Sequence, residues 1–264
     1  MFDAYIERWR LIPDGDPIVT RTSALLPVRS AGQPAILKVA TVEEEMRGGR
    51  LMCWWEGNGA ARVLARDANA LLLERACGRL PLTGIVRSGN DDEATRIICG
   101  VVADLHTPRP SPPPPLPSLE DWFQPLHAAA ESHGGILREA AAQASTLLAS
   151  QVDATVLHGD IHHGNVLDFG SRGWLAIDPK GLIGERAFDY ANLFCNPDAA
   201  TANAPGRLRR QVEVVSTTAR LDRCRLLGWI IAWAGLSAAF SLQDGDPPDD
   251  ALRLAELAVA ELQR

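Results

Sequence analysis

The sequence predicts an α+β fold of two lobes, in which a small β-sheet lobe with one helix precedes a mostly helical lobe. Short extended stretches fill the chain to about residue 75, and helical periodicity dominates from Asp91 onward. A β-type island at 155–179 interrupts the predicted helices. The expected N-terminal lobe is 1–75, the expected C-terminal lobe is 76–264, and the expected hinge is about 73–79.

Composition restricts the class of protein. The 264 residues are 46% hydrophobic, which is enough for a large core or two packed lobes without disulfides. This content and a net charge of −7 exclude a disordered chain, and no apolar run approaches the roughly 20 residues of a membrane span. Five cysteines without a C-x-x-C pair argue against a disulfide framework or a zinc ribbon. The N-terminus lacks a signal-peptide pattern, so we expect a cytoplasmic protein that does not bind membranes.

Charge indicates the class of partner. With 33 acidic residues against 26 lysines and arginines, the chain is not expected to bind nucleic acid and suits a cationic small-molecule substrate. Lys38 and Lys180 are the only lysines in the sequence, so the place of each is informative. The sequence does not indicate the oligomeric state.

The N-terminal third is expected to be mainly sheet. Its extended stretches alternate with turn-type residues, which predicts an antiparallel meander followed by a strand pair. These stretches lie at 17–23, 24–30, 34–40, 61–65 and 70–74.

One helix is expected within this sheet region. Three glutamates at 43–45 suit the positive end of a helix dipole, and the helix should run to Trp55 before the glycines at 57 and 59. Gly48 and Gly49 are poor helix formers and weaken this prediction.

The rest of the chain is expected to be mostly helical. Asp91–His106 has its apolar residues on one helical face, whereas 108–117 holds seven prolines and should be an extended surface loop within one lobe. Trp229 and Trp233 are four residues apart on an apolar helix, which favours core packing over a sugar-stacking surface. Further helices are predicted at 118–130, 134–150, 188–195, 204–219, 221–241 and 248–263.

The β-type island carries the chemistry. It reads H-G-D-I-H-H-G-N from His158 to Asn165, and Asp178 follows at the end of a predicted hairpin. One free carboxylate at Asp160 and oxygen donors at Asn165 and Asp178 are what Mg²⁺ and phosphoryl transfer require. A carboxylate in such a site orients the attacking hydroxyl and takes its proton.

The histidines allow another interpretation. His158, His162 and His163 could form a zinc cluster, because imidazoles are good zinc ligands. Adjacent residues on a strand face opposite ways, however, and no acidic fourth ligand completes the set. We therefore favour the magnesium interpretation and expect His163 to pack or form hydrogen bonds within the loop.

The island resembles the H-x-D-x-x-x-x-N catalytic loop of protein kinases, and its H-G-D form is that of the aminoglycoside phosphotransferases. Asp178 stands where kinases have the D-F-G aspartate. The strand A-I-L-K ending at Lys38 is similar to the kinase V-A-I-K strand, whose lysine pairs with the ATP phosphates. The segment L-L-L-E-R-A at 71–76 resembles the strand and hinge that join the two lobes of a kinase.

Further motifs resemble the streptomycin 6-kinase branch of the aminoglycoside/hydroxyurea antibiotic resistance kinases, over almost the whole chain. The resemblance implies a bilobal kinase-like fold, magnesium dependence and ATP-dependent phosphorylation of an aminoglycoside, foremost the 6-hydroxyl of streptomycin, giving resistance. The motifs are W-W-E-G-N-G-A-A-R-V at 54–63, G-W-L-A-I-D-P at 173–179, G-E-R-A-F-D-Y-A-N at 184–192 and W-I-I-A-W-A-G-L-S-A-A at 229–239.

The same resemblance implies a role for individual residues. Asp160 would be the catalytic base, Asn165 and Asp178 would bind Mg²⁺, and Lys38 would anchor the ATP phosphates. The glutamate that pairs with Lys38 would be Glu45, with Glu44 as the alternative. The remaining expected site residues are Glu74, Arg75 and Ala76 around adenine, His158 as a brace of the loop, and Asp189 as a supporting acid that hydrogen-bonds the loop backbone.

The sequence departs from the kinase pattern at the loop that covers the phosphates, because Thr20–Ser23 contains no glycine. Two other functions stay open. A kinase for hydroxyurea or another small-molecule alcohol would use the same catalytic residues. A non-catalytic nucleotide-binding pseudokinase would bind ATP without magnesium-dependent turnover.

Overall fold

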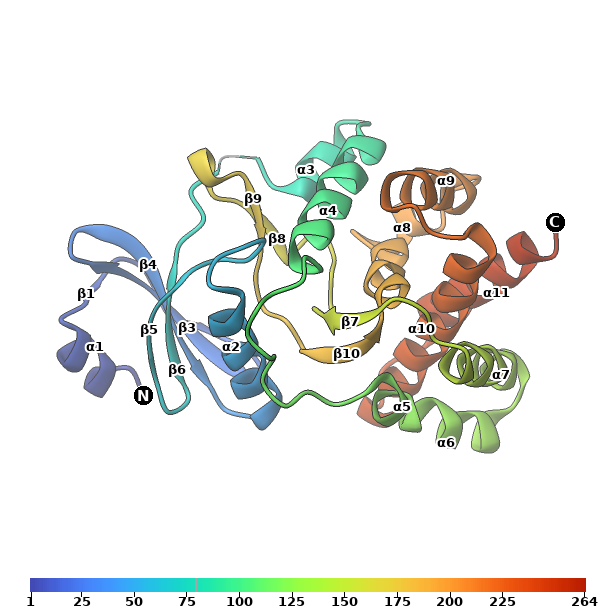
Figure 1. Ribbon diagram of the computed structural model, residues 1–264, viewed down its shortest axis with the longest axis horizontal. Helices are drawn as coiled ribbons and strands as arrows, with labels where there is room; N and C mark the ends of the chain where they lie inside the picture. Colours follow the sequence, from blue (N-terminus) through green and yellow to red (C-terminus); the bar gives the residue numbers. More distant parts are fainter. Residues whose placement is uncertain (79) are drawn as a thin grey trace.

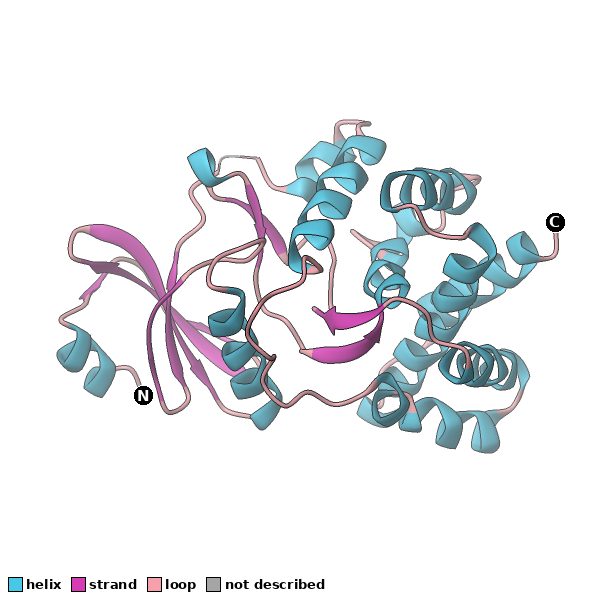
Figure 2. Ribbon diagram, viewed as in Figure 1, coloured by secondary structure: helices cyan, strands magenta, loops and turns pink. Residues whose placement is uncertain are grey.

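The computed structural model describes residues 1–78 and 80–264, and it confirms the expected α+β fold (Figures 1 and 2). An N-terminal sheet lies at one end of the molecule and a mostly helical part at the other, with the C-terminus in the helical part (Figure 1). Residue 79 of the expected hinge lies outside the described residues.

The N-terminal sheet is antiparallel, with strand order β1-β3-β4-β6-β5 and β2 paired to β3. The meander is therefore confirmed, although the stretch at 17–23 contributes only a two-residue strand. Helix α1 (Asp3–Trp9), which the sequence analysis missed, precedes the sheet. The strands are β1 (Ile12–Pro13), β2 (Ile18–Val19), β3 (Ser23–Ser30), β4 (Gln33–Ala40), β5 (Val63–Asp67) and β6 (Ala70–Glu74).

Alternation along β4 gives the sheet two different faces. Leu37 and Val39 belong to a buried cluster against which the aromatic side chains of α1 pack. Ile36 and Lys38 point to the other face and line a cavity. The strand pattern therefore presents one lysine to a largely apolar cavity, opposite Leu25 and Leu71 in the strand register.

Helix α2 (Glu43–Trp55) is regular despite its two glycines. An added Cβ at Gly48 would overlap the backbone carbonyl oxygen of Pro179, and one at Gly49 would lie 2.8 Å from the Leu71 side chain. The glycines therefore allow α2 to approach both the 178–180 segment and the sheet. Sequence analysis treated them only as helix breakers.

We expect Gly48→Ala to destabilise the protein by about 1–3 kcal/mol, because the methyl group meets backbone that cannot rotate away. Gly100→Ala on helix α4 (Asp91–Leu105) is the matched control, since nothing lies within 4 Å of its added Cβ. That change should stabilise the protein by about 0.5–1 kcal/mol through its effect on the unfolded chain. Urea unfolding of both variants measures the two effects. Equal stability changes at the two glycines would contradict the close approach of α2.

The C-terminal part is built from helices around one large core. The expected helix at 118–130 is two helices, because Pro125 cannot donate within a continuous helix and instead lies in the first turn of α6. The expected helix at 188–195 is the 3₁₀-helix η2 (Arg186–Cys195), and η1 is Gly170–Arg172. The α-helices are α3 (Leu82–Arg87), α4 (Asp91–Leu105), α5 (Leu119–Trp122), α6 (Gln124–His133), α7 (Gly135–Ala149), α8 (Ala199–Ala202), α9 (Arg207–Ala219), α10 (Arg223–Asp244) and α11 (Asp249–Leu262).

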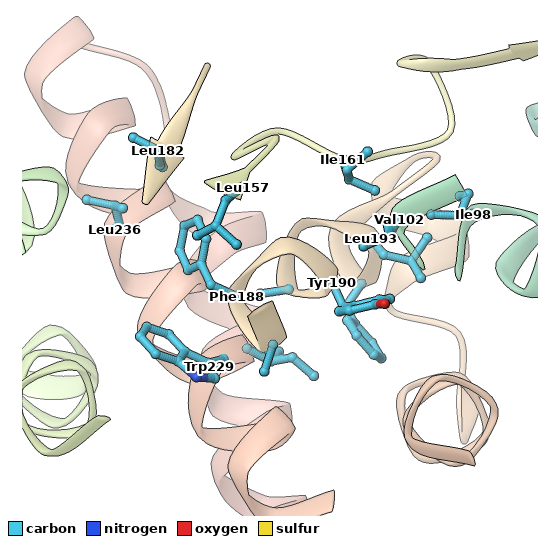
Figure 3. Packing of buried hydrophobic residues seen from close by; sticks show 14 of the residues in the cluster. Ile98, Val102, Leu157, Ile161, Leu182, Phe188, Tyr190, Leu193, Trp229 and Leu236 are labelled. Atoms are coloured by element: carbon cyan, nitrogen blue, oxygen red, sulfur yellow. The ribbon is translucent and has the colours of Figure 1, made fainter. Parts of the chain in front are cut away.

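Helix α10 corrects one expectation. By length and composition alone it could cross a membrane, whereas the sequence analysis expected no apolar run of that length. In the structure it is a core helix, because 67% of its most apolar 18-residue segment is buried inside the protein. Trp229 is fully buried beside Phe188 (Figure 3) and also packs against Phe123. Trp233 packs on the edge of the same core. The spacing of the two tryptophans therefore reflects core packing, as expected.

Two short antiparallel pairs form the predicted island. Strand β7 (Ala154–Leu157) pairs with β10 (Leu182–Glu185), and β8 (Val166–Asp168) pairs with β9 (Trp174–Ala176). The predicted hairpin between Asn165 and Asp178 is thus confirmed. Its strand ends return the chain to the loop that follows β7.

The proline-rich segment 108–117 is extended, as expected, but it is more than a surface loop. It runs from α4 to α5 past α2 (Figure 1). The Trp54 indole N–H of α2 donates to the Ser111 carbonyl at 3.0 Å, and the Arg109 guanidinium lies 5.0 Å from the Trp54 ring centroid. This segment therefore contacts α2 directly and helps to hold it.

Candidate active site

The site forms where four elements meet: strand β4, helix α2, the loop 158–165 after β7, and the segment after β9. Lys38 of β4 forms ion pairs with both Glu45 of α2 and Asp178. The Thr22 hydroxyl donates to the other carboxylate oxygen of Glu45 at 2.6 Å. Lys38 and Glu45 are buried, whereas the Asp178 side chain is 46% exposed, so Asp178 faces the open side.

The pair formed by Lys38 and Asp178 sets the charge state of the carboxylate. Burial alone would raise the pKa of Asp178, but the adjacent Lys38 ammonium holds it below its ordinary value. Asp178 is therefore ionised at neutral pH. Glu44, the alternative partner of Lys38, instead pairs with Lys180 at 2.6 Å.

The loop 158–165 is fixed by buried hydrogen bonds. Burial lowers the pKa of His158, so its ring is neutral. Its Nδ1 accepts from the Asp160 backbone N–H at 3.2 Å, which leaves Nε2 protonated to donate to the Ile177 carbonyl at 2.8 Å. The ring also stacks on Trp55, with centroids 6.1 Å apart. His158 thus ties the loop to the segment that carries Asp178.

Asp189 of η2 holds the same loop from the opposite side. Its carboxylate accepts from the backbone N–H groups of His158 at 2.9 Å and Gly159 at 2.7 Å. The His106 Nε2 atom is 2.8 Å from the same carboxylate. Because Asp189 is only 2% exposed, these contacts keep its buried charge satisfied and hold the turn before Asp160.

Asp160 lies at the tip of the loop. Asn165 Nδ2 donates to its backbone carbonyl at 2.9 Å and, more weakly, to Oδ2 at 3.4 Å. Asn192 Nδ2 donates to Oδ1 at 2.7 Å. Burial raises the pKa of the Asp160 carboxyl to about 7, although the Lys180 ammonium opposes this shift. A carboxylate of this basicity suits a general base near neutral pH.

The donor set fits a magnesium ion. The Asn165 amide nitrogen is used within the loop, so its oxygen is the atom left for a ligand. Asp178 pairs with Lys38 through Oδ1, which leaves Oδ2. One carboxylate oxygen and one amide oxygen are hard donors of the kind Mg²⁺ binds, together with phosphate oxygens and water. The zinc alternative gains no support, because residues 1–78 and 80–264 contain no group of three or more His, Cys, Asp or Glu side chains placed to hold a metal.

A cavity of about 340 Å³ opens beside these groups. Lys38, Glu45 and Asp178 line it, as do Glu74, Arg75 and Ala76. The remaining lining is mainly apolar and comes from both parts of the molecule: Leu25, Ile36, Met52, Leu71, Leu73, Leu167, Phe169 and Ile177. Apolar walls with a cation at the cavity suit a flat heterocycle that carries phosphates.

The charged side chains of the expected hinge form hydrogen bonds and ion pairs within the protein. Glu74 accepts from the Arg62 backbone N–H at 2.6 Å and pairs with Arg172, while Arg75 pairs with Asp14 at 2.6 Å. Contacts to a nucleotide from this segment would therefore come from its backbone.

Sequence reasoning missed three residues at the site. Thr22, in the loop without glycines, contacts Glu45; Lys180 pairs with Glu44; and Asn192 contacts Asp160. Lys180 stands out in the sequence as one of only two lysines, next to the Asp178 motif, but the sequence pattern gave it no role. Thr22 and Asn192 act across distances of 23 and 32 residues, which no local pattern encodes.

Comparison with known proteins agrees with this geometry. Residues 8–245 match the family model of the aminoglycoside/hydroxyurea antibiotic resistance kinases. The streptomycin 3''-kinase of Klebsiella pneumoniae is 54% identical over 245 residues, covering 91% of this chain and 92% of that protein. The streptomycin 6-kinase of Streptomyces griseus is 30% identical over 271 residues, covering 97% and 86%.

The fold is also similar to a solved structure. The crystal structure of a thermostable mutant of an aminoglycoside phosphotransferase, with ADP and hygromycin B, superimposes with a TM-score of 0.70. The sequences are 14% identical, and the match covers 98% of this chain and 97% of the other. At this identity the likeness concerns the fold.

Proposed function

The chain belongs to the aminoglycoside/hydroxyurea antibiotic resistance kinase family, and we propose that it transfers the γ-phosphoryl group of ATP to a hydroxyl of streptomycin. The observation that carries this proposal is the meeting of Asp160 and Asn165 with Asp178, Lys38 and Glu45 beside a largely apolar cavity. Phosphorylated streptomycin is the product, and resistance is the consequence for the host.

We assign the cavity to ATP. The adenine lies between the apolar side chains of the two parts, next to the backbone of Glu74, Arg75 and Ala76. Lys38 binds phosphate oxygens and is held in place by Glu45. This assignment keeps 73–79 as the proposed hinge and residue 75 as the proposed lobe boundary.

Asp160 acts on the acceptor. Its carboxylate accepts a hydrogen bond from the streptomycin hydroxyl and takes the proton as the oxygen attacks phosphorus. The new O–P bond forms as the bond between γ-phosphorus and the bridging oxygen breaks, and ADP leaves with that oxygen. Asn165 and Asp178 would hold Mg²⁺, which neutralises the phosphate charge when bound. Asp160 then releases the proton to solvent.

The proposal also concerns which hydroxyl of streptomycin is phosphorylated. The motifs resemble the 6-kinase branch, which implies the 6-hydroxyl. The relative named as a 3''-kinase is 54% identical, however, against 30% for the 6-kinase. Because acceptor orientation depends on residues outside the shared catalytic motifs, the higher identity across nearly the full length favours the 3''-hydroxyl.

The purified product of ATP, Mg²⁺ and streptomycin tests this position. We expect a phosphorus–proton correlation in the NMR spectrum at the 3'' proton of the N-methylglucosamine ring. A correlation at position 6 of the streptidine ring would overturn the 3'' assignment and restore the 6-kinase expectation. If no streptomycin product forms but hydroxyurea or another alcohol is turned over, the streptomycin assignment is wrong and the proposed phosphoryl transfer still holds.

A further inference from the structure

The helix η2 presents two side chains to the loop that carries Asp160. Asp189 and Asn192 are three residues apart, and a 3₁₀-helix has three residues per turn, so their side chains lie on one edge. Asp189 accepts from the loop backbone, while Asn192 donates to the Asp160 side chain. One turn of helix therefore holds both the backbone and the carboxylate of the loop.

The other two edges of η2 are anchored in the core. Phe188, Tyr190 and Leu193 are almost fully buried. They lie among core side chains that include Leu157, just before the loop, and Ile161, within it (Figure 3). A helix packed in this way is a rigid support, because core side chains have little room to move.

The orientation of the Asn192 amide is set by its neighbours. Its Oδ1 accepts from Asn196 Nδ2 at 3.1 Å and from the Cys195 thiol at 3.3 Å. The amide nitrogen must then face Asp160, and it donates at 2.7 Å. Asn192 is 7% exposed, so water competes little for this bond.

The two carboxylate oxygens of Asp160 therefore differ in the hydrogen bonds that they accept. Oδ1 receives the short bond from Asn192, whereas Oδ2 receives only the 3.4 Å contact from Asn165. The second oxygen is therefore the better acceptor for a new hydrogen bond.

We propose that Asn192 is a positioning residue that binds Oδ1 of Asp160 and so turns Oδ2 toward the hydroxyl of the acceptor. This inference rests on the proposed function, because it assigns an oxygen to the base of that reaction. Asn192 itself does not contact the reacting atoms. Its contribution passes entirely through Asp160.

A double-mutant cycle tests this dependence. Asn192→Ala should lower kcat by about 100-fold, the order expected when a catalytic group is displaced by about 1 Å. The KM values for ATP and streptomycin should stay within about twofold, because substrate binding is not affected. In an Asp160→Ala background, Asn192→Ala should cause no further loss, since the group it positions is absent. A purely structural role would give the same loss in both backgrounds.

Two further variants make the result decisive. Asn69→Ala removes two hydrogen bonds of a half-buried amide, to Ala40 and Tyr5, far from Asp160 in the sequence and outside the cavity. It should lower Tm without changing kcat. Asn192→Asp keeps the shape and removes the donor, and it should lose activity like the alanine variant. An unchanged kcat in either folded Asn192 variant, or equal losses in both backgrounds, would overturn the proposal.

The proposed function is tested separately in the same assay. If the wild-type protein phosphorylates a different acceptor, the streptomycin assignment fails and the cycle is measured with that acceptor. If the wild-type protein turns over no acceptor while the variants bind ATP equally, the positioning role fails together with the catalytic role of Asp160.

Discussion

Asp160→Asn is expected to lower kcat by about 10²- to 10⁴-fold while leaving the KM for ATP nearly unchanged. Asparagine keeps the size of the side chain and can still accept at one atom, but it cannot take a proton from the acceptor hydroxyl. The carboxylate it replaces has a pKa raised to about 7 by burial, which suits a base at neutral pH. Steady-state kinetics with ATP, Mg²⁺ and streptomycin measures the effect.

The control for this variant is its thermal stability, which shows whether it is folded. Removing a partly buried charge should leave Tm equal to or higher than that of the wild-type protein, because an ionised carboxylate is costly to remove from water. A folded Asp160→Asn protein with wild-type kcat would contradict the assignment of the base. A variant that fails to bind ATP would indicate that Asp160 acts on the nucleotide instead.

Lys38→Met is expected to lower kcat/KM for ATP by about 10²- to 10³-fold, in the range for loss of one preorganised charged donor at a transferring group. Methionine preserves much of the length and the apolar stem. It removes the ammonium that lies between Glu45 and Asp178, so two carboxylates then face each other and the phosphates. Nucleotide titration and kinetics together separate weaker binding from slower transfer.

Arg253→Met on the surface of α11 is the matched control, since among the described residues Arg253 forms a hydrogen bond and an ion pair only with Glu256 and both side chains are exposed. It should leave kcat/KM unchanged. Equal kinetics for Lys38→Met and the wild-type protein would exclude Lys38 as the phosphate anchor. Loss confined to the streptomycin KM would place the lysine on the acceptor side.

Much of the fold and site could be predicted because the signals are local. The loop from His158 to Asn165 and the hairpin to Asp178 form one contiguous segment, so their meeting follows from a tight turn and a strand pair. The A-I-L-K strand likewise marks Lys38 by its alternation. The helix carrying Glu45 was expected from its acidic start, although the pairing of Glu45 rather than Glu44 with Lys38 depends on helix rotation.

Other features depend on contacts between distant segments. Gly48 weakens a helix in isolation, and only the neighbouring Pro179 carbonyl explains its presence. The 3₁₀ form of η2 reflects packing that propensity does not record, whereas the break between α5 and α6 follows from the local signal of Pro125. Asn192 lies in a recognisable motif, but its contact with Asp160 spans 32 residues.

The acceptor was the least predictable feature. The catalytic residues resemble those of kinases that act on several hydroxyls, because the same base and metal ligands serve any alcohol placed in line. Phosphorylation of the 6-hydroxyl or of the 3''-hydroxyl of streptomycin would require a different orientation of the substrate above Asp160. No motif in the sequence marks the residues that would orient the acceptor, and its acidic loop residues look like ordinary solvated charge.

The most direct test of the central claim is ADP release from the purified protein with ATP and Mg²⁺, with and without streptomycin. We predict streptomycin-dependent release that disappears without Mg²⁺ and in Asp160→Asn. Hydroxyurea, kanamycin and simple alcohols in parallel should give little turnover. ATP binding without turnover of any acceptor would contradict the claim and indicate a nucleotide-binding pseudokinase.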